Sequence, residues 1–218
     1  MIEMLIVDNI ITDDEIQQLR NYFVAYNHKK YLNWKDGDKI IDHRLTISPN
    51  TPEFSIINRV VATHFSNPVQ IWSAYQQQTN PHNIHIDDFG CDTDYFRYTY
   101  IIAMDTVPEF KAVVWKETCR DNAELSKFYA NWGEQVQHKT KVSTISETED
   151  LEHTIDLGQN IYIADYLTLD GVFTYKAGSC CFFDASQLHC TNNWKKYSQF
   201  SNRQLLQIHV LNKEKIHC

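Results

Sequence analysis

The sequence predicts an α+β protein that is mainly β, with a core of antiparallel strands arranged as a sandwich or barrel. Two features lead to this fold class. Helical segments with capping signals stand near the start, and a long body rich in Ile, Val, Tyr, Phe and Thr follows. The chain has 218 residues, a length that one hydrophobic core can serve. We therefore expect a single domain over 1–218, with a strand and helices over 1–68, the core over 69–211 and an insertion at about 117–160.

Three segments carry helix signals. Thr12 and Glu15 form a capping box, in which a hydroxyl and a carboxylate each satisfy a free N–H of the first turn. The pair Thr51-Pro52 predicts a second helix, with Thr as its N-cap and Pro as its first residue. Asp121 provides a third capping signal, and Gly133 is the expected end of that helix.

The remaining segments favour strands because β-branched and aromatic residues alternate with polar or glycine breaks. A Ser/Thr/Glu-rich stretch over 140–156 is expected to be a surface excursion. The expected strands are Ile40–Ser48, Val69–Gln78, Ile84–Asp87, Tyr95–Met104, Lys111–Lys116, Ile161–Leu169, Gly171–Tyr175, Gly178–Asp184 and Leu205–Leu211.

Composition excludes several classes of protein. The formal net charge of −8 disfavours a general nucleic-acid binder, and no glycine-rich nucleotide-binding motif occurs. No apolar run reaches the length of a membrane helix, and the acidic N-terminus does not resemble a signal peptide. The six cysteines include no C-x-x-C pair, so we expect reduced thiols in a cytoplasmic protein.

Two short segments carry the candidate chemistry. His85 and Asp87 stand two positions apart on an expected strand, so both side chains leave the same face. Far downstream, an apolar strand runs into a short polar turn that is expected to present His189. Two imidazoles and one carboxylate are the facial ligand set of non-haem Fe(II) oxygenases.

The His-x-acid pair alone is a weak signal, because chance gives about 1.3 such pairs at this composition. The order of the segments strengthens it. The pair follows a strand that ends in Tyr75-Gln-Gln-Gln, and Arg203 enters another apolar strand beyond His189. His82 stands near the pair, and His209 lies at even spacing from Arg203, so both are candidates to face the same pocket.

In this arrangement the chain resembles the 2-oxoglutarate- and Fe(II)-dependent oxygenases, in particular their prolyl-4-hydroxylase-like branch. The resemblance runs from about Val69 to Leu211, and the N-terminal strand leading into a capped helix also fits it. It implies a double-stranded β-helix (jelly-roll, cupin-like) core with flanking N-terminal helices and a helical insertion. It also implies a dioxygenase of hydroxylase type that couples 2-oxoglutarate decarboxylation to oxidation of a substrate by O2.

Carried over by position, the resemblance implies that His85, Asp87 and His189 ligate iron. It implies that Arg203 clamps the distal carboxylate of 2-oxoglutarate, and that Tyr75 donates a hydrogen bond to the same molecule. Three other basic residues stay open as the clamp: Lys195, Lys196 and Arg97.

The sequence departs from the prolyl hydroxylase pattern in two places. The 104 positions that separate His85 from His189 exceed the gap in compact members, and the usual glycine pair before Glu117-Thr118 is absent. The substrate therefore stays open between a peptide side chain and a small molecule, and a homodimer is left open. Two rival interpretations remain: a cupin-like metal-containing binding protein without 2-oxoglutarate chemistry, and an interaction domain in which the His-x-Asp pair is incidental.

Overall fold

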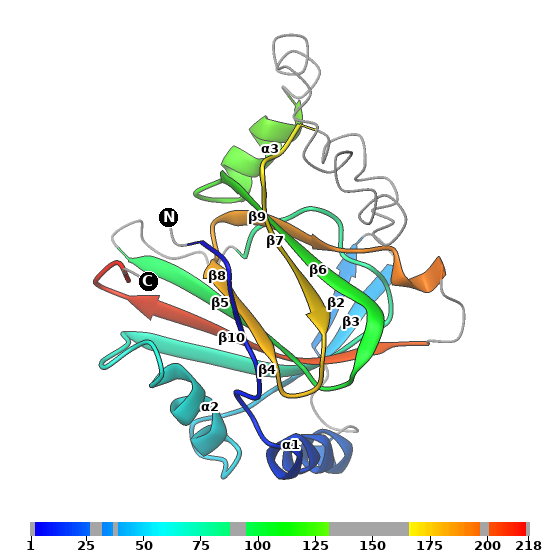
Figure 1. Ribbon diagram of the computed structural model, residues 1–218, viewed down its shortest axis with the longest axis vertical. Coiled ribbons are helices and arrows are strands. Elements are labelled where there is room, and N and C mark those ends of the chain that lie inside the picture. The colour runs from blue at the N-terminus through cyan, green and yellow to red at the C-terminus, as the bar shows by residue number, and fades with distance from the viewer. Residues whose placement is uncertain are drawn as a thin grey trace.

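The computed structural model describes residues 3–26, 32–36, 39–87, 95–130, 166–196 and 201–216. Within these ranges the strands form two antiparallel sheets (Figure 1). The larger sheet has the order β1-β8-β5-β10-β4-β3-β2, and the smaller sheet has the order β7-β6-β9. The predicted mainly-β, jelly-roll core is confirmed.

The large sheet draws strands from the whole length of the chain. Its members are β1 (Leu5–Val7), β2 (Leu32–Asp36), β3 (Lys39–Thr46), β4 (Gln70–Gln78), β5 (Phe96–Ala103), β8 (Cys180–Asp184) and β10 (Arg203–Asn212). The small sheet consists of β6 (Val107–Thr118), β7 (Leu169–Tyr175) and β9 (Gln187–Thr191).

The two faces of β10 show how alternation builds the core. Leu206, Ile208 and Val210 are buried against helices α1 (Asp13–Tyr26) and α2 (Phe54–Val61), which lie together on the outer side of the large sheet (Figure 1). The intervening residues, from Arg203 to Leu211, face the space between the two sheets. A period of two thus divides one strand into a core face and a cavity face.

Helix starts follow the capping chemistry with one exception. Glu15 N donates to Thr12 Oγ1 over 3.2 Å and Thr12 N donates to Glu15 Oε2 over 2.8 Å, which confirms the capping box of α1. Asp121 Oδ1 likewise accepts the N–H of Glu124 over 2.7 Å at the start of α3 (Asn122–Ala130). The expected end at Gly133 lies outside the described residues.

The second helix begins at Phe54, so the prediction of Pro52 as its first residue is wrong. The Thr51 hydroxyl donates to Ser48 O over 2.8 Å, which ties it to the preceding turn and removes it from the helix cap. Phe54 N donates to Thr51 O over 3.1 Å, a three-residue spacing typical of a tight turn ahead of the helix.

Three strand predictions need correction. Residues 84–87 form no regular strand and pair with β9 only through an isolated bridge between His85 and His189. His189, expected on a turn, lies inside β9, and neither β9 nor β2 was predicted. Leu169 starts β7, while residues 161–165 of the predicted Ile161–Leu169 strand and most of the 117–160 insertion lie outside the described ranges.

Gly178 joins the N-terminal segment to the sheet. Its backbone φ is +78°, and its carbonyl accepts the N–H of Ile10 over 2.8 Å. A Cβ added at Gly178 would lie 2.6 Å from the carbonyl oxygen of Ile11, so both conformation and space require glycine here.

None of the described helices combines the length and apolarity that crossing a membrane would require.

Candidate metal centre

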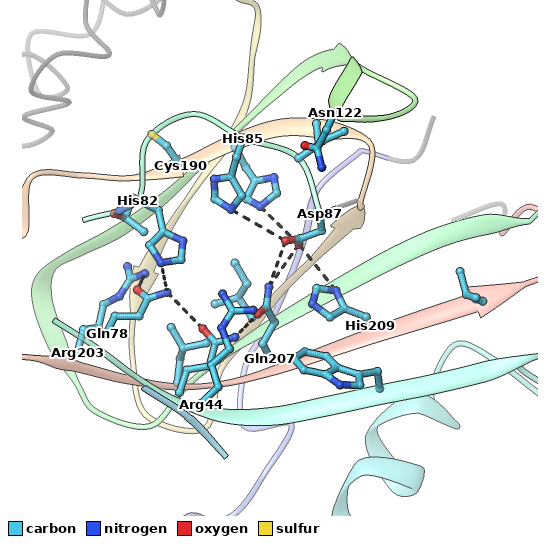
Figure 2. Close-up of a pocket in the computed structure, with 18 of the residues that line it drawn as sticks. Arg44, Gln78, His82, His85, Asp87, Asn122, Cys190, Arg203, Gln207 and His209 are labelled. Atoms are coloured by element: carbon cyan, nitrogen blue, oxygen red, sulfur yellow. Dashed lines mark hydrogen bonds and ion pairs between the residues drawn. The ribbon is translucent and has the colours of Figure 1, made fainter. Parts of the chain in front are cut away.

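The structure brings His85, Asp87 and His189 together at the inner surface between the two sheets. One potential ligand atom from each residue lies within 4.8 Å of the others. Asp87 Oδ2 is 3.5 Å from His189 Nε2, and Asp87 Oδ1 is 4.0 Å from His85 Nε2. Figure 2 shows the labelled side chains of His85 and Asp87 directed toward one another across this space.

Backbone pairing holds the two histidines opposite each other. His85 N donates to His189 O, and His189 N donates to His85 O, each over 2.9 Å. Asp87 N then donates to Ala185 O over 3.0 Å, in the turn that joins β8 to β9. The segment that carries the His-x-Asp pair is therefore fastened to β9 and its turn, although it forms no strand of its own.

The ring nitrogens of both histidines have defined roles. His85 Nδ1 lies 2.7 Å from Asn83 O, and His189 Nδ1 lies 2.9 Å from Gln187 O. A carbonyl oxygen can only accept, so each Nδ1 carries a proton and Nε2 is the ring nitrogen that remains to bind a metal. Metal-binding histidines usually donate the N–H of their other ring nitrogen to an acceptor in this way, which fixes the orientation of the ring.

Three potential ligand atoms therefore face one another. Burial lowers the pKa of His85 well below its usual value, and the neighbouring imidazoles of His189 and His82 add to the effect, so the ring is neutral. Burial alone would raise the pKa of Asp87, but the nearby imidazoles, His189 foremost, hold that pKa well below its ordinary value. Neutral imidazole and ionised carboxylate are the forms that bind metal.

Asp87 is also held from the side of the large sheet. Thr99 Oγ1 donates to Asp87 Oδ2 over 2.8 Å, and Gln207 Nε2 lies 3.4 Å from both carboxylate oxygens. His209 Nδ1 contacts the Thr99 hydroxyl at 3.1 Å, and its ring stacks on Trp72 with centroids 5.1 Å apart. These contacts fix the orientation of the carboxylate.

The triad opens into a cavity of about 460 Å³ between the sheets. The lining includes Arg203, Gln78 and His82 and, toward the opposite end of the β4–β10 ladder, Gln70 and Trp72. His82 and His209, the two further histidines named as candidates to face the pocket, both line this cavity.

Arg203 is buried, with 1% of its surface exposed. Its Nη2 donates to Gln78 Oε1, its Nη1 lies 3.4 Å from Lys111 O, and its guanidinium carbon lies 4.7 Å from the centre of the Tyr175 ring. Its Nε has no hydrogen-bond partner, and no carboxylate of the described residues pairs with it. An isolated buried cation in a cavity is costly unless an anion joins it.

Arg97 and Lys195, two of the other basic candidates, have their side chains bonded elsewhere. Arg97 donates to the carbonyl of Arg120 and does not line the cavity. Lys195 is exposed and bonds Asn80 Oδ1 over 2.9 Å. Lys196 ends the short 3-10 helix Trp194–Lys196, and its side chain lies outside the described part of the chain.

The expectation that Tyr75 contacts 2-oxoglutarate is wrong for this structure. Tyr75 belongs to the core beneath α1, where its ring lies 4.5 Å from that of Phe23 and its hydroxyl donates to Gln204 Oε1. The cavity is lined by the even-numbered residues of β4, such as Gln76 and Gln78, so Tyr75 points to the opposite face.

Sequence reasoning missed a second charged group at the cavity. Arg44 Nε lies 2.9 Å from both oxygens of the fully buried Asp42, and Arg44 lines the cavity. His82 Nε2 lies 3.6 Å from the same carboxylate. The only signal in the sequence is the spacing of two between Asp42 and Arg44 on an expected strand, which carries no information about a site 40 positions later.

Comparison with known proteins finds solved structures of similar fold but no match by sequence. No protein-family model and no curated protein matches the sequence. Among solved structures, the epimerase SnoN from nogalamycin biosynthesis, described as non-heme and alpha ketoglutarate dependent, matches with a TM-score of 0.62 and 11% identity, covering 96% of this chain and 78% of that one.

Two further solved structures agree. HygX from Streptomyces hygroscopicus, with nickel and 2-oxoglutarate bound, matches with a TM-score of 0.54 and 10% identity, over 95% of this chain and 82% of that one. A prolyl-4-hydroxylase from Pseudomonas putida matches with a TM-score of 0.52 and 8% identity, over 98% and 94%. The chain therefore has the fold that these 2-oxoglutarate-dependent and prolyl hydroxylase enzymes share.

Proposed function

We propose that this protein is an Fe(II)- and 2-oxoglutarate-dependent dioxygenase of hydroxylase type. The observation that carries the proposal is a pair of features in one cavity: a two-His, one-carboxylate cluster and the buried Arg203, which pairs with no carboxylate of the described residues. A metal cluster alone would equally suit a metal-binding protein without catalysis, and a buried arginine alone would equally suit a structural role. Together they supply a metal site and an anion site that a dicarboxylate can span.

The donor set fits ferrous iron. His85 and His189 would each offer Nε2, and Asp87 would offer a carboxylate oxygen. Iron bound there, with 2-oxoglutarate, supplies the activation of O2 that oxidises a substrate. The residues of the chain keep the imidazoles in one tautomer, hold the carboxylate through Thr99 and Gln207, and place all three on a rigid wall.

The anion site fits the far carboxylate of 2-oxoglutarate. The guanidinium of Arg203 can present parallel N–H donors to a carboxylate, and the unpartnered Nε is one of them. Because the group is buried, water screens the pairing little. The Tyr175 ring packs against the guanidinium and holds it in the cavity.

The end of the cavity away from Arg203 is the proposed place for a small-molecule or peptide substrate. Gln70, Trp72 and Leu211 line it, and together they offer an amide, an aromatic face and an aliphatic surface. We also propose a cytoplasmic enzyme, which the free, buried thiols of four described cysteines support: Cys119, Cys180, Cys181 and Cys190. A homodimer stays a prediction that size-exclusion chromatography tests.

Anaerobic titration with Fe(II) and then 2-oxoglutarate tests the proposal. We expect one equivalent of Fe(II) to bind, and a weak visible charge-transfer band to develop when 2-oxoglutarate is added. The D87A variant should lose the metal, and the R203M variant should keep it while requiring far more 2-oxoglutarate. Metal binding without any response to 2-oxoglutarate would instead identify a cupin-like binding protein, and absence of metal binding would leave the His-x-Asp pair incidental.

A further inference from the structure

A line of side-chain amides runs along the cavity wall from Arg203 to Asp87. Arg203 Nη2 donates to Gln78 Oε1, and Gln78 Nε2 lies 3.4 Å from Gln76 Oε1. Gln76 Nε2 donates to Gln207 Oε1, and Gln207 Nε2 lies 3.4 Å from both oxygens of Asp87. In Figure 2 the dashed lines follow part of this path between the labelled residues. The amide chain, defined as Gln78, Gln76 and Gln207, therefore links the proposed anion site to the proposed metal site.

The two ends of the amide chain impose one direction on it. A guanidinium can only donate hydrogen bonds, and an ionised carboxylate can only accept them. Each glutamine between them must therefore turn its oxygen toward Arg203 and its NH2 group toward Asp87. Reversing any single amide would place two acceptors against each other on one side of that amide and two donors against each other on its other side.

The register of the sheet explains why these residues meet. Gln78 pairs with Arg203 across the β4–β10 ladder, and Gln76 pairs with Leu205. Gln207 stands two positions beyond Leu205, so Gln76 and Gln207 are diagonal neighbours on the same face. All three amides are buried, with Gln76 fully enclosed. A buried amide left without a partner costs about 1–3 kcal/mol, which disfavours any break in the series.

We propose that Gln78, Gln76 and Gln207 are positioning residues that couple the 2-oxoglutarate end of the cavity to the metal end. This inference rests on the function proposed above. Gln207 orients the Asp87 carboxylate, Gln76 orients Gln207, and Gln78 orients Gln76 while itself anchored by Arg203. A carboxylate that binds Arg203 competes with Gln78 for the same donor, and so acts on Asp87 at a distance. Reciprocity requires that metal binding at Asp87 act equally on the anion site.

Metal affinity in the absence of 2-oxoglutarate tests this coupling without any catalytic turnover. Co(II) titration, followed by visible absorption, reports on the triad directly. Gln76 has no bond to Asp87, yet the Q76M variant should weaken Co(II) binding by about tenfold, the lower end of the effect of outer partners of metal ligands. Q77M is the matched control, because Gln77 is the adjacent residue on the same strand and does not line the cavity. It should bind Co(II) as the wild type does.

A double variant shows whether the amides act as one series. Q207M should weaken Co(II) binding by at least as much as Q76M, and Q76M/Q207M should be no weaker than Q207M alone, because the path is already broken. The proposal is overturned if the losses of Co(II) affinity in Q76M and Q207M multiply in the double variant. It is also overturned if Q76M binds Co(II) as tightly as Q77M does. Circular dichroism checks folding. Should Q76M fail to fold, Q78M provides the same test from one link further away and should also lose Co(II) affinity.

The outcome for Asp87 separates failure of this inference from failure of the proposed function. If D87A binds Co(II) as tightly as the wild type, the triad is not the metal site, and both proposals fall. If D87A loses Co(II) while Q76M and Q78M match the control, the metal site stands and only the amide chain is refuted.

Discussion

Replacing Arg203 with methionine should affect ligand affinity and stability in opposite directions. The variant keeps a long side chain but removes a guanidinium that is 1% exposed and has no carboxylate partner among the described residues. Loss of one partner from a buried, hydrogen-bonded charge pair costs about 2–5 kcal/mol, so 2-oxoglutarate affinity should fall by about 30- to 4000-fold. R203K keeps the charge but not the paired N–H donors of the guanidinium, and its 2-oxoglutarate affinity should fall about tenfold.

The ligand-free protein should respond the other way. A buried charge without a counter-charge destabilises the fold, and hydrophobic replacement of buried ionic groups is often stabilising by about 1–4 kcal/mol. The cation–π contact with Tyr175 and the bond to Gln78 offset part of this gain. We therefore expect R203M to melt a few degrees above the wild type without ligand.

Calorimetric titration and thermal unfolding measure the two effects on the same samples. R97M is the matched control, because Arg97 does not line the cavity, and it should leave 2-oxoglutarate affinity unchanged. The anion-site role of Arg203 is refuted if R203M binds 2-oxoglutarate within threefold of the wild type. It is also refuted if ligand-free R203M is less stable by more than about 2 kcal/mol, since Arg203 would then be a structural residue.

Three further predictions address the supports of the site and of the fold. T99V removes the hydroxyl that donates to Asp87 and should weaken Co(II) binding by about 10- to 100-fold, and affinity equal to wild type would contradict that role. Burial, only partly offset by Asp87, lowers the pKa of His209 to about 4 from 6.5. Its contribution to stability is therefore complete above pH 6.5 and is lost as the pH falls toward 4. Urea unfolding of the metal-free protein should show the free energy of unfolding falling by about 3 kcal/mol over that interval, and H209N should lack this fall. G178A should lower the free energy of unfolding by at least about 2 kcal/mol, whereas G171A should cost less because its added Cβ meets only the flexible end of a methionine side chain.

Local features were predictable where the chemistry is local. The capping box at Thr12 and the capping signal at Asp121 depend on residues three positions apart, and both are present. The apolar run Leu205–Leu211 predicted a strand, and β10 contains it, with Leu206, Ile208 and Val210 buried. The prediction failed at Thr51, because a hydroxyl can bond the preceding turn as well as the following helix.

The metal-ligand residues of the site were predictable, and the residues that surround and orient them were not. His85, Asp87 and His189 were named from spacing, order and family resemblance, and the structure brings them within 4.8 Å of one another. Tyr75 was assigned by position along the strand, but which face of a strand turns toward a cavity depends on the sheet as a whole. A shift of one residue sends every side chain to the other face.

The sequence by itself determined the helix caps, the β-rich body and the residue types able to hold a metal, because these depend on neighbours within a few positions. The tertiary structure alone decided which distant residues meet. The β4–β10 register sets Gln78 beside Arg203 and Gln76 diagonal to Gln207, and the bridge to β9 sets His85 opposite His189. Pairing between strands more than 100 positions apart follows from the closure of the whole sheet, and no local pattern encodes it.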